Sequence, residues 1–218
     1  PTNAQQIPAQ FKDAEGYWSG FSARARLLVV NRAAKTKPAS VLAYVDPKTK
    51  GKAVIANPLF GTTTAQMAAL FALWGDEKGK QFLAGLKANR VKLSTSNGES
   101  ADFVGSGEFE FALVDSDDAV DRMRHGKPID IVYPDQGEGE VGVLIVPNAV
   151  ALIRGGPNAD NGKKLIEYLV SKETERKLAV ADCAQIPLNP GVTPPKELKS
   201  IEQIRVMKVD YANLAAKL

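Results

Sequence analysis

The sequence predicts an α/β protein, because short β-rich runs alternate with helical runs along most of its 218 residues. Such an alternation places helices on both faces of a sheet. The composition fits a folded chain of this class, with 44% hydrophobic and 24% charged residues. The length suffices for one large domain or for two smaller ones.

Strands and helices are expected in turn over the first two thirds of the chain. Apolar and β-branched runs predict strands at 26–31, 52–57, 91–95, 109–114 and 129–133. Helical periodicity predicts helices at 40–45, 65–74, 76–89, 96–104 and 116–125. Asp76 is expected to cap one of these helices, and Ser96 with Glu99 has the spacing of a capping box.

The next segment has a different pattern. Two apolar runs, 141–146 and 149–153, are separated only by Pro147-Asn148, which is too short for a helical crossover between parallel strands. A pair of helices is expected at 158–170 and 171–181. Their predicted inward-facing residues are Leu165, Ile166 and Leu169.

The end of the chain is predicted to be mostly irregular. The proline-rich stretch 187–195 reads as a surface crossing, and 205–209 reads as extended. Asp210 is expected to cap a short terminal helix that reaches Leu218.

A threonine-rich junction precedes the apolar helical stretch 65–74. Gly61, Thr62, Thr63 and Thr64 bring hydroxyl groups and no carboxylate to a helix start. The first backbone amides of a helix lack intrahelical partners and carry the positive end of the dipole, so this junction suits an anion. The alternative interpretation is that Thr62 or Thr63 only caps a buried helix.

An acidic cluster follows the strand predicted at 109–114. Asp115, Asp117 and Asp118 could hold a hard cation, or the ammonium or hydroxyl groups of an organic ligand. The alternative is that Asp115 or Ser116 caps the next helix and the other carboxylates complement its dipole. Open α/β sheets bind ligands at the carboxyl ends of their strands. The junction at Gly61, the pair Ser96-Asn97 and this cluster are therefore expected to share one edge.

Several function classes are excluded by composition. A net charge of +3 with scattered basic residues predicts neither nucleic-acid binding nor attachment to a membrane surface. No apolar run approaches the ~20 residues of a membrane span, and no signal peptide opens the chain. His125 and Cys183 are each the only residue of their type, so common zinc sites and histidine-based nucleophile pairs cannot be assembled, and no enzyme is expected.

Several passages resemble the ferric-ion class of extracellular, periplasmic solute-binding proteins of ABC importers. They are the run from Trp18 through Arg24 to Asn31, then 57–64, 115–118, 133–136, 145–152 and 185–187. The resemblance covers nearly the whole chain in order and spacing. It implies a type II periplasmic-binding fold, in which two α/β lobes joined by crossing strands close on a ligand, and it implies a permease partner in the inner membrane.

The resemblance also implies roles for individual residues. Gly61, Thr62, Thr63 and Thr64 would hold an anion such as the phosphate or carbonate that accompanies iron, with Ser96 and Asn97 as further contacts. Trp18, Arg24 and Tyr133 would lie at the cleft or hinge. Two tyrosines normally bind ferric ion in this class, and the matching positions here are Asp117 and Asp118. Carboxylates suit Fe(III), a divalent cation or a small phosphorylated organic solute that carries hydroxyl or amino groups.

The resemblance lacks a match for the beginning of the family's first lobe. Pro1 to Phe11 reads as a linker without an initiator Met, so we expect a longer parent protein. Residues 1–33 and 143–190 are predicted to form a partial first lobe, and 34–142 with 191–218 a complete second lobe. Function as an importer's solute-binding component is preferred, with the effector domain of a transcriptional regulator as the alternative and a metal-dependent enzyme in last place.

Overall fold

The computed structural model describes residues 1–215, which form two compact units. Unit 1 comprises Pro1–Arg24 and Ile145–Gln203, and unit 2 comprises Ala25–Leu144 with the segment that starts at Ile204. The chain therefore passes from one unit to the other after residues 24, 144 and 203. The predicted lobes have their boundaries after residues 33, 142 and 190. The assignment of these units to the two lobes of a binding protein stays a prediction.

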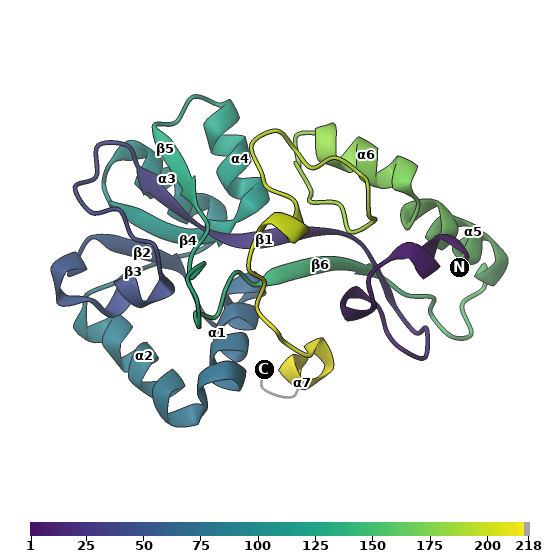
Figure 1. The fold of residues 1–218 in the computed structure, drawn as a ribbon, viewed down its shortest axis with the longest axis horizontal. Coiled ribbons are helices and arrows are strands. Elements are labelled where there is room, and N and C mark those ends of the chain that lie inside the picture. The colour runs from purple at the N-terminus through teal and green to yellow at the C-terminus, as the bar shows by residue number, and fades with distance from the viewer. Residues whose placement is uncertain (216–218) are drawn as a thin grey trace. The chain divides into compact units, whose positions relative to one another are not determined.

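One mixed sheet organises the strands (Figure 1). Its members are β1 (Ser19–Asn31), β2 (Ala53–Ala56), β3 (Lys92–Ser94), β4 (Phe111–Asp115), β5 (Ile129–Val132) and β6 (Ile145–Val150). The order is β3-β2-β4-β1-β5, and β6 pairs with β1 outside this order. Strand β2 runs parallel to β3 and β4, while β1 runs antiparallel to β4 and β5. The predicted α/β class is confirmed.

Helices cover both faces of the sheet in unit 2. They are α1 (Gly61–Trp74), α2 (Asp76–Ala88), α3 (Asn97–Ser106), α4 (Ser116–Arg124) and the short α7 (Tyr211–Ala215). Helices α3 and α4 contribute Ala101, Val104 and Ala119 to a buried cluster with Val54 and Val114 of the strands. On the other face Tyr44, in the 3₁₀ turn Val41–Val45, packs edge-on against Phe111. The predicted end of the terminal helix, Leu218, lies outside the described residues.

The start of α1 differs from the capping interpretation. The helix begins at Gly61 and its N-cap is Phe60, which makes no side-chain capping bond. Thr62 and Thr63 therefore lie in the first turn, and neither is the cap. Gly61 has φ +59°, a left-handed conformation that glycine adopts without a Cβ clash, so the chain can turn sharply from the loop into the helix.

The start of α3 agrees with the capping box in part. Ser96 accepts a hydrogen bond from the Glu99 backbone amide at 3.0 Å, which confirms it as the cap. The Glu99 carboxylate bonds the backbone amide and hydroxyl of Thr95, not the amide of Ser96.

Unit 1 contains α5 (Ala159–Leu169), α6 (Lys172–Val180) and strand β6. The separation of the two apolar runs at Pro147-Asn148 was wrong, because the single strand β6 passes through both residues. Proline is tolerated where its missing N–H is not needed by a neighbouring strand. Of the three residues predicted to face inward, Ile166 is buried and Leu169 is half-buried, but Leu165 was wrongly placed, because it is 56% exposed.

The prediction that residues 187–195 cross the surface was wrong for the first residues of this segment. Leu188 and Asn189 are buried, and their backbone amides donate to the carboxylate of buried Glu175 at 2.7 and 2.9 Å. These charge-assisted bonds supply the partners that a buried irregular segment needs. Within residues 1–215 we find no helix that is long and apolar enough to cross a membrane.

Candidate functional site

Arg26 lies at the centre of a polar network inside unit 2. Its side chain is fully buried on β1, where residue 26 stands directly opposite Asp115 of β4. The Nη1 atom lies 2.8 Å from Asp115 Oδ1, so the two residues form a buried ion pair. An isolated buried guanidinium would be strongly unfavourable, and the carboxylate removes most of that penalty.

The same guanidinium also bonds side chains at the starts of two helices. Nη1 donates to Thr62 Oγ1 at 3.1 Å and to Asn97 Oδ1 at 3.0 Å, and Nη2 donates to Thr63 Oγ1 at 3.1 Å. Thr62 and Thr63 belong to the first turn of α1, and Asn97 is the first residue of α3. One side chain therefore ties two helix starts to the end of β4.

Asp115 completes this network with its second oxygen. Its Oδ2 accepts a bond from the Thr62 hydroxyl at 2.8 Å and from Asn97 Nδ2 at 3.1 Å. Asn97 Nδ2 also donates to Thr62 Oγ1 at 2.9 Å. The Thr62 hydroxyl and the Asn97 amide nitrogen thus donate to protein acceptors. What the start of α1 offers a ligand is its backbone N–H groups, with no acidic residue in the first turn.

Three carboxylates come together beside this network. Ligand atoms of Asp115, Asp117 and Asp118 lie within 4.8 Å of one another, with Asp115 buried and the other two half-buried. The pKa of Asp118 is raised to about 6, chiefly by burial and also by the neighbouring charges of Asp117 and Asp115, while Arg122 and Arg26 act in the opposite direction. A carboxyl with such a shift gains most from a positive ligand group.

Arg122 lies at the edge of the acidic cluster and is engaged elsewhere. It forms a two-pronged contact with Asp102 at 3.0 and 3.1 Å, and a further ion pair with Asp121 at 2.9 Å. Its distance to Asp118 is 3.8 Å. Gly98 of α3 adjoins this point, since a Cβ there would lie 3.2 Å from Asp118 Oδ1. Asp118 is thus close to the start of α3.

The structure brings together most of the residues singled out from the sequence. The residues in contact around Arg26 or in the acidic cluster are Thr62, Thr63, Asn97, Asp115, Asp117 and Asp118. Ser96 acts as the cap of α3, and Gly61 is exposed ahead of Thr62. Thr64 Oγ1 is buried without a hydrogen-bond partner among the described residues.

The three residues expected at a cleft or hinge are distributed over both units, and their role there stays a prediction. Tyr133 is half-buried in unit 2 directly after β5, while Trp18 and Arg24 belong to unit 1. Arg24 Nη2 donates to Asn148 Oδ1 at 2.7 Å, and Asn148 in turn bonds Ser22 and Gln185.

Arg26 was missed as a site residue by sequence reasoning. The available signal was a charged residue at the head of the apolar run Arg26–Asn31, which the strand prediction treated as wholly buried. A buried arginine needs a carboxylate partner, and Asp115 at the end of another predicted strand was a candidate.

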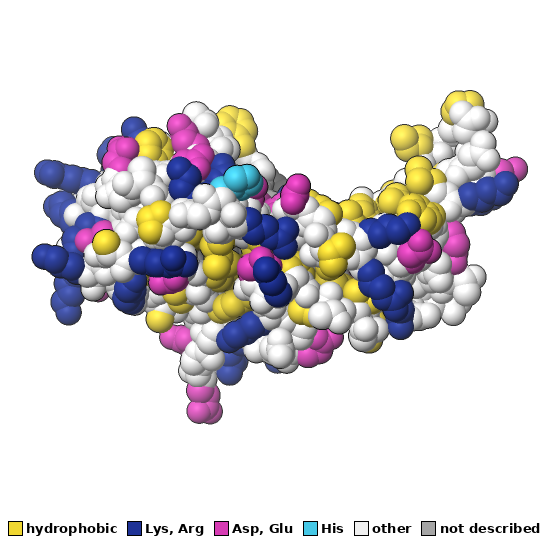
Figure 2. All heavy atoms as spheres, turned by 90° about the horizontal axis from the view of Figure 1, so that it is seen from above, with side chains coloured by type: hydrophobic (Ala, Val, Ile, Leu, Met, Phe, Trp, Pro, Cys, Tyr) yellow, Lys and Arg dark blue, Asp and Glu magenta, His cyan; other side chains and the backbone are white. Residues whose placement is uncertain are grey.

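Unit 1 has a hollow of about 620 Å³ that is chemically different. Its lining includes Tyr17, Trp18, Leu152, Lys163 and Glu167. Figure 2 shows hydrophobic side chains gathered on one face of this unit, whereas acidic and basic side chains are interspersed over unit 2. Its charged lining residues are Lys163, Lys164 and Glu167, so it offers no cluster of carboxylates like that of unit 2. We therefore place the candidate site in unit 2.

Comparison with known proteins decides the family. The family described as "Bacterial extracellular solute-binding protein" matches residues 1–217. The chain belongs to this family. Its members are defined by solute binding and not by catalysis, which agrees with the expectation from composition.

Two kinds of curated relative are similar to this family member. A "Putative 2-aminoethylphosphonate-binding periplasmic protein" of Salmonella typhimurium is 31% identical over 165 residues, or 75% of this chain and 49% of the relative. The "Major ferric iron-binding protein" of Neisseria meningitidis serogroup A is 28% identical over 205 residues, or 92% of this chain and 61% of the relative. The chain thus spans about half to two thirds of these proteins.

Solved structures show the same fold. The apo ferric ion-binding protein A of Pasteurella haemolytica has a TM-score of 0.87 at 24% identity, covering 100% of this chain and 71% of that one. Apo FutA2 from Synechocystis has a TM-score of 0.85 at 22% identity, covering 99% and 72%. These likenesses establish the fold of the described units.

Proposed function

We propose that this solute-binding protein serves an ABC importer and binds, through unit 2, a small ligand that carries both a negative and a positive group. The negative group would be bound by the backbone amides at the start of α1. The positive group would be bound by Asp117 and Asp118. The importer's permease and a periplasmic location form part of the same proposal, supported by the family.

The observation that carries the proposal is the convergence of opposite charges within one small region. Ligand atoms of three carboxylates lie within 4.8 Å of one another, and Asp115 among them is hydrogen-bonded to Thr62 in the first turn of α1. The positive end of a helix dipole and a pair of half-buried carboxylates are therefore neighbours. This arrangement is complementary to a zwitterion.

Among such ligands we favour an aminoalkylphosphonate. The similarity to proteins named for 2-aminoethylphosphonate binding supports this choice. Asp117 and Asp118 stand where the ferric class, by resemblance, has two tyrosines, and carboxylates pair well with an ammonium group. A ferric ion with phosphate or carbonate is the second candidate, since carboxylates also bind hard cations and other relatives are named for iron.

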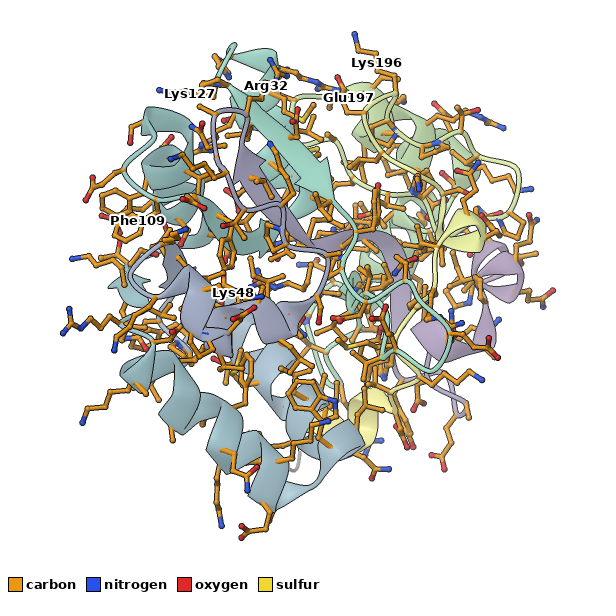
Figure 3. The ribbon with its side chains drawn as sticks, turned by 60° about the vertical axis from the view of Figure 1, so that its left-hand side comes forward. Arg32, Lys48, Phe109, Lys127, Lys196 and Glu197 are labelled. Carbon is orange, nitrogen blue, oxygen red and sulfur yellow. The ribbon has the colours of Figure 1, made fainter. Side chains whose placement is uncertain are left out.

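The test is isothermal titration of the chain with 2-aminoethylphosphonate and, separately, with ferric citrate. We expect binding of the aminophosphonate, and an affinity loss of tenfold or more in Asp117→Asn and Asp118→Asn. Asp130→Asn is the matched control, because Asp130 pairs at 3.0 Å with Arg32, which points outward beyond the end of β1 (Figure 3). Equal affinity in all three variants would contradict the proposed site, and binding of iron alone would favour the second candidate.

A further inference from the structure

The side chains around Arg26 have little hydrogen-bonding capacity left for a ligand. The Thr62 hydroxyl donates to Asp115 and accepts bonds from Arg26 and Asn97. The Asn97 amide nitrogen donates to two protein acceptors, Thr62 Oγ1 and Asp115 Oδ2. The one donor of the Thr62 hydroxyl is thus engaged, and the Asn97 amide nitrogen is held by acceptors of the protein itself.

Asp115 is the acceptor that takes up these donors. It accepts bonds from the buried cation Arg26 and from two residues at helix starts, Thr62 and Asn97. An external oxyanion at the same point would receive the same three kinds of donor. The Asp115 carboxylate thus occupies the position that an external oxyanion would otherwise take.

The charges around this position oppose a free anion. Arg26 and Asp115 cancel each other, and Asp117 and Asp118 add negative charge within a few ångströms. Like charges at such distances repel strongly in a partly buried setting. The backbone dipoles at the starts of α1, α3 and α4 favour an anion there, and a ligand that brings its own cation offsets the repulsion.

We infer that Asp115 determines specificity: its carboxylate, held by Arg26, takes up the donors of Thr62 and Asn97 and excludes free inorganic anions from the start of α1. An anionic group is admitted only as part of a ligand that also carries a positive charge. This inference rests on the proposed function, because it assumes that the start of α1 is where the ligand's anion binds.

The test uses inorganic phosphate and the variant Asp115→Asn. The substitution removes the negative charge, leaves Arg26 without a carboxylate and releases the Thr62 hydroxyl as a donor. We expect 10 mM phosphate to raise the melting temperature of this variant by about 5 °C or more. The unchanged protein should show no shift relative to chloride at the same ionic strength.

Two further variants separate donor release from net charge. Asp118→Asn removes one negative charge from the same cluster and leaves the donors of Thr62 and Asn97 engaged, so phosphate should not stabilise it. Asp115→Glu keeps the charge and should also be insensitive to phosphate. A phosphate effect of equal size in Asp118→Asn, or any phosphate stabilisation of the unchanged protein, would overturn the inference.

The outcome stays decisive if Asp115→Asn folds poorly by itself. The yield of refolded protein, followed by circular dichroism, is then measured with and without phosphate, and phosphate is expected to restore it. No restoration would overturn the inference. Failure of the proposed function looks different: the unchanged protein would bind neither 2-aminoethylphosphonate nor ferric citrate, whatever phosphate does to Asp115→Asn.

Discussion

Arg24 and Arg26 lie two residues apart on β1, yet they belong to different units and to different kinds of network. In unit 2, Arg26 is fully buried and pairs with a carboxylate. In unit 1, Arg24 is half-buried, and its interactions include a hydrogen bond from Nη2 to the amide oxygen of Asn148. The two arginines on one strand thus differ in burial, because Arg26 is enclosed together with its carboxylate partner and Arg24 is partly open to solvent.

The difference predicts that the loss of an arginine has unequal effects in the two units. Breaking a buried ion pair leaves an uncompensated charge in a region of low dielectric constant. Breaking a bond between a half-buried arginine and an amide leaves groups that water can still reach. We therefore expect the loss of Arg26 to lower the free energy of unfolding more than the loss of Arg24 does.

The largest expected effect is that of Arg26→Met. Loss of the guanidinium leaves Asp115 buried without its cation and removes bonds to Thr62, Thr63 and Asn97, so unfolding free energy should fall by about 3–5 kcal/mol. Urea denaturation followed by circular dichroism measures this.

Arg24→Met is the matched control and should cost about 1 kcal/mol. The double variant Arg26→Met/Asp115→Leu should be more stable than Arg26→Met alone, because it removes the stranded carboxylate. Equal losses of unfolding free energy in Arg24→Met and Arg26→Met would contradict the expected difference between the two positions.

A smaller effect is expected from pH through Asp118. Its pKa in the folded protein is raised to about 6 from a usual value of 3.8, mainly by burial. The folded state therefore takes up a proton before the unfolded chain does. This group's contribution to unfolding free energy should rise as pH falls from about 7 to 4, by about 1–2 kcal/mol after allowance for its partial exposure.

Asp118→Asn removes that contribution and so tests whether Asp118 is the group responsible for it. Stability of the unchanged protein and of the variant should converge toward pH 4 and differ most above pH 6, where the variant should be the more stable. Parallel stability curves across this range would show that Asp118 does not titrate as described. Urea midpoints at several pH values provide the measurement.

The smallest effect concerns two serine caps, one in each unit. Ser96 accepts from the Glu99 amide at the start of α3, and Ser171 accepts from the Thr174 amide at the start of α6. Ser96→Ala and Ser171→Ala should each cost about 1 kcal/mol. Similar values would show that local capping is alike in both units, so that the arginine difference reflects buried charge. A much larger cost for Ser96→Ala would mean that the cap also supports the Arg26 network.

Much of the fold could be predicted because the signals are local. The alternation of apolar runs predicted β2, β3, β4 and β5 to within a few residues, and the Ser96 cap follows from side-chain chemistry over four residues. The edge shared by the threonine junction and the acidic cluster follows from parallel strands, whose carboxyl ends lie together.

The errors arose where distant residues decide. Leu165 lies next to Ile166 on α5, and which of them is buried depends on what packs against the helix. Residues 187–189 read as a loop, yet the carboxylate of Glu175 satisfies their backbone and allows burial. The cap of α1 was misplaced because Thr62 and Thr63 find partners on Arg26, which removes their reason to cap the helix.

By itself the sequence determined the α/β class, the positions of most helices and strands, and the clustering of threonines and aspartates at strand ends. These features depend on periodicity and on neighbours within a few residues. Only the tertiary structure decided that Arg26 pairs with Asp115, 89 residues away, and that this pair takes up the donors once expected to face a ligand. Hydrogen-bond saturation is a property of groups brought together in space, and no spacing along the chain reveals it.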